Sequence, residues 1–129
     1  MIVLTIRTDK PESEIGIFKS GKQIAYEEWA AHRQLAETIH KKIEELLESQ
    51  SLELRDLNGV ICFSGPGSFT GLRIGASVAN AIAYSLEIPV IGVNGDGWLA
   101  DGLRLVEEPS SKYVVPDYGA PVFITRQKK

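Results

Sequence analysis

The feature that most constrains the fold is a glycine-rich loop that joins an apolar run to a helical pattern. The apolar run is Leu57 to Ser64 (LNGVICFS), and its composition predicts a strand covered on both faces, as in a parallel sheet. Gly65-Pro66-Gly67 then excludes both a helix and a regular strand. Ser68 or Thr70 can cap a following helix, and nothing interrupts that helix before Leu86. The sequence therefore predicts a strand, a tight loop and a helix in direct succession.

Small residues recur at every fourth position of this helix and form a smooth stripe. The stripe consists of Gly71, Gly75, Ala79 and Ala83, and it runs beside a bulky stripe of Ile74, Val78 and Ile82. Each glycine costs the helix about 1 kcal/mol relative to alanine, so a packing or functional reason should offset the two. Two explanations are open: close packing on the chain's own sheet, or contact with the helix of a partner. Under either explanation, Gly75 should tolerate no bulky side chain.

A glycine-rich loop before a helix can also bind phosphate, through backbone N–H groups and the helix dipole. The candidate residues for such an anion site are Gly65, Gly67, Ser68 and Thr70. The loop lacks the Lys-Ser/Thr pair of a Walker motif and the three-glycine spacing of a dinucleotide fingerprint. The general signal for an anion site is therefore weak, and the sequence predicts no bound cofactor.

Composition narrows the classes of protein to consider. The 129 residues are 43% hydrophobic and 24% charged, which fits one globular domain. A net charge of −3 argues against broad nucleic-acid binding, because phosphate contacts need clustered Lys and Arg, and only the end Arg126–Lys129 is basic. The first residues lack a signal-peptide pattern, and no run is long and apolar enough for a membrane span. We therefore expect a cytoplasmic protein with no membrane association.

Few side chains could carry chemistry. Cys62 is the only cysteine and lies in the middle of a predicted strand, so we expect a buried thiol, no disulfide and no thiolate metal cluster. His32 and His40 are the only histidines, and on one helix they would lie about 12 Å apart along its axis, too far to share a metal ion. No histidine, serine and acid follow one another in the order of a hydrolase. The sequence predicts no metal site and no catalytic residue.

The order of the predicted elements gives the fold class. Three strands, with a hairpin turn at Ser20-Gly21, precede an amphipathic helix from Gln34 to Ser49. The strands span Ile2 to Ile6, Glu14 to Lys19 and Lys22 to Trp29. After the strand–loop–helix unit come a strand from Val90 to Val93 and a short helix from Trp98 to Leu105. This order predicts an α/β fold, a single ribonuclease H-like or actin-like half domain with a mixed sheet flanked by helices. We assign residues 1–106 to this domain and residues 107–129 to a C-terminal tail.

The stretch Gly65 to Gly75 (GPGSFTGLRIG) resembles the signature of the TsaB (YeaZ) family, which helps to install threonylcarbamoyladenosine next to the tRNA anticodon. The resemblance extends from Leu35 to about Val93. Where the family usually reads Ile-Asp-Thr-Ser, this chain has Ile6-Arg7-Thr8-Asp9, so that Arg7 replaces an acidic side chain expected near nucleotide phosphates. Full-length relatives carry a second lobe, which we expect to be mostly absent here. Pro116 to Thr125 resembles the family's closing segment.

The resemblance implies a function and partners. In this family the TsaB-type protein is the non-catalytic partner of a TsaD-type ligase, which carries the metal and the nucleotide. The chain is thus expected to be a scaffold without catalytic residues, bound to a TsaD-like catalytic subunit, with a TsaE-like ATPase as a further partner and no strong direct binding of tRNA. Alone, it could form a homodimer. Two other hypotheses stay open: a glycoprotease-like hydrolase, or a homodimeric actin-like nucleotide-binding protein unrelated to tRNA modification.

The predicted partner surface lies on the two long helices, through which related proteins of this family pack their first lobes together. The residues assigned to it are Leu35, Ile39, Leu72, Gly75, Val78, Ala79 and Ile82. Because the two helices offer more apolar positions than one sheet face can cover, we expect some of the five large side chains among them to remain exposed in the monomer. A charged residue at Ile39 or Ile82 should then abolish association and leave the fold intact.

Overall fold

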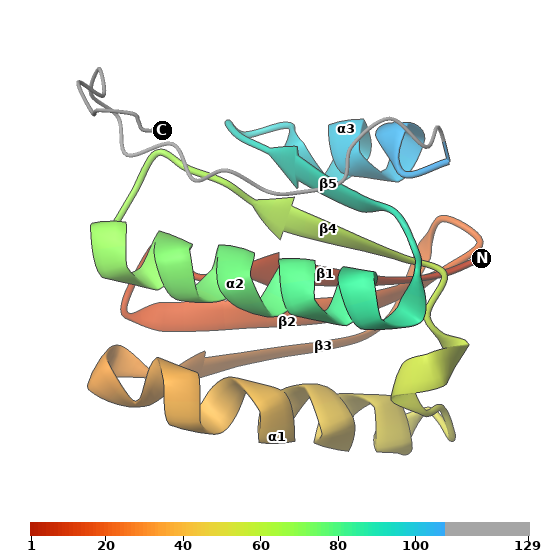
Figure 1. Ribbon diagram of the computed structural model, residues 1–129, viewed down its shortest axis with the longest axis horizontal. Helices are drawn as coiled ribbons and strands as arrows, with labels where there is room; N and C mark the ends of the chain where they lie inside the picture. The colour runs from red at the N-terminus through yellow and green to blue at the C-terminus, as the bar shows by residue number, and fades with distance from the viewer. Residues whose placement is uncertain (108–129) are drawn as a thin grey trace.

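The structure, a computed structural model, describes residues 1–107 except for the side chains of His32 and Phe69. Its centre is a five-stranded mixed sheet in the order β3-β2-β1-β4-β5 (Figure 1). The strands are β1 (Ile2–Arg7), β2 (Glu12–Lys19), β3 (Lys22–Ala30), β4 (Gly59–Phe63) and β5 (Val90–Val93). The first three form an antiparallel meander, whereas β4 runs parallel to β1 and β5 runs parallel to β4. The predicted α/β fold, a ribonuclease H-like half domain with a mixed sheet, is confirmed.

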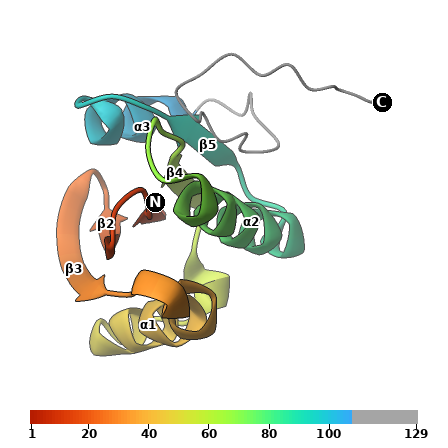
Figure 2. The ribbon, with the colours of Figure 1, turned by 90° about the vertical axis from the view of Figure 1, so that its left-hand side faces the viewer.

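Three helices flank the sheet. They are α1 (Leu35–Ser49), α2 (Phe69–Leu86) and α3 (Trp98–Leu105), with short 3-10 turns η1 (His32–Gln34) before α1 and η2 (Leu54–Asp56) before β4. Figure 2 shows α1 and α2 on one side of the sheet and α3 on the other, over β4 and β5. None of these helices is both long and apolar enough to cross a membrane. The predicted elements are confirmed to within two residues at most ends.

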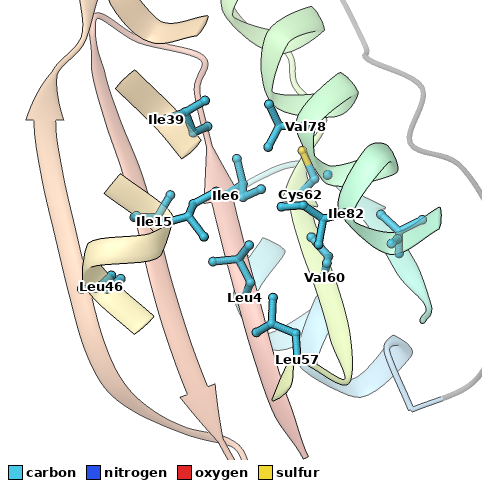
Figure 3. Close-up of a cluster of buried hydrophobic side chains, with 14 of the residues drawn as sticks. Leu4, Ile6, Ile15, Ile39, Leu46, Leu57, Val60, Cys62, Val78 and Ile82 are labelled. Atoms are coloured by element: carbon cyan, nitrogen blue, oxygen red, sulfur yellow. The ribbon is translucent and has the colours of Figure 1, made fainter. Parts of the chain in front are cut away.

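The larger core lies between the sheet and the helices α1 and α2 (Figure 3). It is built from alternate residues of the strands and from one side of each helix: Leu4, Ile6, Ile15, Val60 and Cys62 from the strands, with Ile39, Leu46, Val78 and Ile82 from the helices. Burying each large aliphatic side chain contributes about 1.5–3 kcal/mol. The intervening residues Ile61 and Phe63 of β4 face α3, where the Phe63 ring meets Trp98 edge to face at a centroid distance of 5.6 Å.

The two outer strands of the sheet differ in length. β3 has nine residues and joins β2 through the Ser20-Gly21 turn, in which both residues have positive φ (54° and 81°), as a two-residue hairpin turn requires. A β-bulge between Ile17 and Phe18 interrupts the pairing of β2 with β3. β5 has only four residues. Apart from Glu107, the predicted tail, including Pro116 to Thr125, lies outside the described residues.

Candidate functional site

The glycine-rich loop ends where Ser68 caps α2. The Ser68 hydroxyl accepts a hydrogen bond from the Gly71 N–H at 3.5 Å, so Ser68 rather than Thr70 is the capping residue. The Ser68 N–H in turn donates to the Asp9 carbonyl oxygen at 3.1 Å. Gly65 has a φ of 121°, a conformation that residues with a side chain rarely adopt. The loop therefore brings the start of α2 against the residues that follow β1.

The glycines of α2 permit this close approach. A Cβ atom on Gly71 would overlap the Thr8 carbonyl oxygen, and one on Gly75 would overlap the Thr8 hydroxyl. Thr8 is 1% exposed, and its hydroxyl donates to the Gly71 carbonyl oxygen at 2.7 Å. Ala79 and Ala83 are buried further along the same stripe. The small-residue stripe thus packs on the chain's own sheet, which decides between the two explanations that the sequence left open.

Arg7 occupies the carboxyl end of β1 and is held by an acid and an aromatic ring. Its guanidinium donates to both carboxylate oxygens of Asp9, at 2.8 and 3.2 Å, and lies 4.1 Å from the centroid of the Phe63 ring. The hydrogen bond to Asp9 raises the pKa of Arg7 above its ordinary value, so the pair remains ionic. Arg7 therefore places a neutralised ion pair where the family resemblance implies a free carboxylate.

The residues assigned to the partner surface are placed in the core instead. The expectation that some of Leu35, Ile39, Leu72, Val78 and Ile82 stay exposed is wrong, since all five are at most 7% exposed. The reason is that the sheet presents enough apolar surface for both helices: α2 lies mainly on β4 and β1, and α1 lies on β2 and β3. Gly75 and Ala79 are also buried. Any partner that contacts α1 and α2 must therefore meet their outer faces.

Those outer faces enclose a groove of about 400 Å³ between α1 and α2. Its lining combines apolar and polar side chains: Ala36 and His40 from α1, with Thr70, Arg73, Ile74, Ser77 and Val78 from α2. Ala36, His40 and Ser77 are exposed, and Ile74 is half-buried. Sequence reasoning missed most of these residues because it selected the most apolar helix positions, which the sheet takes. The small and polar residues on the side of each helix opposite its apolar side could have indicated this groove.

A second hollow, of about 410 Å³, lies beside the first turn of α2. It is lined by Thr8, Lys10, Pro11 and Ser13, by Arg33 and Leu35, and by Ser68, Thr70, Gly71 and Ile74. Of the predicted anion-site residues, Ser68 and Thr70 line this hollow, whereas Gly65 and Gly67 do not. The space beside Gly67 is filled by Asp9. Sequence reasoning missed Ser13, although the alternation Ser13, Ile15, Ile17 in β2 already marked it as a polar residue at an inward position.

The remaining reactive side chains are isolated. Cys62 is 1% exposed, and burial raises the pKa of its thiol to about 12, so the thiol is neutral at physiological pH. Within residues 1–107, no three His, Cys, Asp or Glu side chains are grouped so that they could hold a metal ion. His40 is exposed on α1.

Comparisons with known proteins give the chain its relatives. The profile of the family described as "TsaD: tRNA N6-adenosine threonylcarbamoyltransferase" matches residues 29–115. The "tRNA threonylcarbamoyladenosine biosynthesis protein TsaB" of Escherichia coli is 31% identical over 102 residues, which are 79% of this chain and 44% of that protein. The chain spans less than half the length of the curated relatives it matches.

Solved structures share the fold. "YeaZ from Pseudomonas aeruginosa" superposes with a TM-score of 0.69 at 24% identity, over 83% of this chain and 49% of that one. The Thermus thermophilus "RuvC in complex with Holliday junction substrate" superposes with a TM-score of 0.53 at 13% identity, over 92% and 85% of the two chains. At such identities the likeness concerns the arrangement of strands and helices alone.

Proposed function

The chain belongs to the family of tRNA N6-adenosine threonylcarbamoyltransferases and is a TsaB/YeaZ-like member of it, and from this we propose its function. The chain acts in the cytoplasm as a non-catalytic scaffold in tRNA N6-threonylcarbamoyladenosine biosynthesis. Its direct partner is a TsaD-like ligase, with a TsaE-like ATPase as a further member of the assembly.

The groove between α1 and α2 is the observation that carries this proposal. Each helix uses its apolar side for the sheet and leaves a mixed outer face, on which Ala36 and Ser77 leave room for the side chains of another helix. Half-buried Ile74 provides an apolar centre, while His40 and Arg73 supply polar groups toward the rim. Two outer helix faces with small residues between them suit the pairing of two helices with two helices of a partner.

Arg7 supports the non-catalytic part of the proposal. A carboxylate at the end of β1 could help to hold a cation and a phosphate, whereas Arg7 brings the opposite charge and is committed to Asp9. The guanidinium also lies over the Phe63 ring. A nucleotide or metal that needs an acid at this point would meet a closed ion pair, so the chemistry is left to the partner subunit.

The affinity of the chain for a purified TsaD-like protein tests the proposal, with two arginine substitutions in the groove and one outside it as a control. Ala36→Arg and Ser77→Arg place a large cation in the groove at exposed positions, so the fold should be retained and the complex weakened at least tenfold, about 1.4 kcal/mol. Ala100→Arg is the matched control, because Ala100 is exposed on α3, on the opposite side of the sheet. Calorimetry gives the affinities, and size-exclusion chromatography shows the complex.

Two results would contradict the proposal. The first is the absence of a complex between the unmodified chain and the TsaD-like protein at micromolar concentration. The second is equal affinity of the groove variants and the α3 control. If the unmodified chain instead sediments as a dimer that the groove variants dissociate, the same surface serves self-association, and the homodimer hypothesis replaces the scaffold.

A further inference from the structure

Ser13 is a buried polar residue whose hydroxyl has no hydrogen-bond partner. It is 1% exposed, and its Oγ is the one buried side-chain nitrogen or oxygen in the described part of the chain for which no partner is found. Strand alternation places Ser13 on the same face of β2 as Ile15 and Ile17, which point into the core. Burying a hydroxyl without a partner is unfavourable, so this position calls for an explanation.

The Ser13 side chain lines the second hollow, at the edge of the sheet where α1 and α2 begin. Figure 1 shows the first turns of both helices at the end of the sheet where β1 and β4 terminate. Ligands of open α/β sheets bind outside the carboxyl ends of the parallel strands, which is where this hollow lies. Its apolar floor is formed by Pro11, Leu35 and Ile74.

The groups around the hollow favour an anion. Exposed Lys10 and Arg33 lie at its rim, and Ser68 and Thr70 belong to the start of α2. α2 has 18 residues. At its start the Ser68 N–H donates to the Asp9 carbonyl oxygen and the Gly71 N–H donates to the Ser68 hydroxyl, so the Thr70 N–H, which has no acceptor within the helix, is the donor beside the hollow.

No carboxylate opposes this charge. No Asp or Glu lines the hollow: Asp9, next to Lys10, gives both of its carboxylate oxygens to Arg7, and Glu12 and Glu14, which flank Ser13 in the sequence, are not among the lining residues. The positive charges of Lys10 and Arg33 and the positive end of the α2 dipole therefore have no negative charge beside them among the residues that line the hollow.

We propose that this hollow binds the phosphate group of a small phosphorylated ligand. The Ser13 hydroxyl donates a hydrogen bond to one phosphate oxygen, the Thr70 N–H at the start of α2 donates to another, and Lys10 and Arg33 supply the balancing charge. The apolar floor contacts the part of the ligand next to the phosphate. The site adjoins the groove that carries the proposed function, since Thr70 and Ile74 line both, but the inference does not depend on that function.

Titration of the ¹⁵N-labelled full chain by nuclear magnetic resonance tests the site. The probes are inorganic phosphate and phenyl phosphate, each added at constant ionic strength against a chloride reference. The amide signals of Ser13, Thr70 and Gly71 should move together and saturate. Tighter binding of phenyl phosphate than of inorganic phosphate would show that the apolar floor takes part, whereas equal affinities would assign the site to the free anion.

Ser13→Ala separates a ligand site from a structural accident. The hydroxyl has no partner to lose, so the variant should fold and melt at least as well as the parent, while its affinity for phosphate falls about tenfold. Lys10→Gln should weaken binding about two- to fivefold, and Lys22→Gln, in the β2–β3 hairpin, is the charge-matched control and should change nothing.

The proposal is overturned if no saturating shift occurs at these amides, or if Ser13→Ala binds phosphate as well as the parent. If Ser13→Ala fails to fold, the double variant Lys10→Gln/Arg33→Gln decides, since both side chains are exposed. Unchanged affinity in that variant also overturns the site.

Discussion

Gly75→Ala tests the physical reason for the glycine signature. Helix propensity alone predicts that alanine stabilises an 18-residue helix by about 1 kcal/mol. The structure predicts the opposite sign, because the new Cβ would overlap the Thr8 hydroxyl and would lie 3.3 Å from the Thr8 Cβ. Thr8 is 1% exposed, and the hydrogen bond to the Gly71 carbonyl oxygen holds its hydroxyl in this position.

Three contributions set the magnitude. Overpacking a closely packed site costs about 1–3 kcal/mol. Displacing Thr8 also weakens its 2.7 Å hydrogen bond to the Gly71 carbonyl oxygen, which contributes about 0.5–1.5 kcal/mol. Against these stands the gain of about 1 kcal/mol in helix propensity. The net expectation is a loss of about 2 kcal/mol in the free energy of unfolding, or about 8 °C in Tm for a domain of this size.

Thermal and urea unfolding followed by circular dichroism measure this loss. Gly97→Ala is the control for space, because the nearest atom to its new Cβ is an Asp101 oxygen at 3.8 Å; since Gly97 is the N-cap of α3, its effect should stay within about 1 kcal/mol. In the double variant Thr8→Ala/Gly75→Ala the hydroxyl is gone, so the loss should be at least about 1 kcal/mol smaller than the sum of the two single losses. A Gly75→Ala variant as stable as the parent would refute the close approach of Thr8 to α2.

Two further predictions follow from burial. Ile39→Glu should abolish folding rather than association, because Ile39 is 0% exposed and the buried carboxylate would have no partner. Ile39→Val should cost only about 1 kcal/mol of stability. Circular dichroism distinguishes the outcomes, and a folded Ile39→Glu variant would contradict the burial. Cys62 should resist Ellman's reagent at pH 8 until guanidinium is added, and rapid labelling of the native chain would contradict this. Because folding raises the pKa of this thiol from 9.0 to about 12, the neutral buried thiol contributes fully to the free energy of unfolding below about pH 9, and that contribution is lost as the pH rises towards 12.

The sequence was sufficient for the fold because each element carries its own local signal. Ser20-Gly21 indicated the hairpin, the apolar run around Cys62 indicated a buried parallel strand, and Gly65 to Gly67 indicated the loop before α2. The inward positions of α1 and α2 were also evident from periodicity. What periodicity could not supply is how much of each helix the sheet covers, since that depends on the strand order and on the curvature of the sheet.

The same limit explains the errors about sites. Ile39 and Ile82 were selected as surface residues because hydrophobicity marks burial without saying whether the chain itself or a partner provides it. Ser13 and Lys10 lie more than fifty residues from Ser68 in the chain, and only the parallel pairing of β1 with β4 brings them to one hollow. Proximity between distant segments was therefore the missing information.

The length and charge of β3 affect how copies of this chain meet one another. An exposed outer strand of nine residues offers a template on which a second molecule could add its own strand and start aggregation. The charged side chains of Lys22, Glu27 and Glu28 on β3 discourage such addition, and the extra residue Ile24 makes a bulge in β3 that interrupts its regular register. β5, at the other edge, offers only four residues. Within the described residues, both edges of the sheet thus oppose the addition of a further strand.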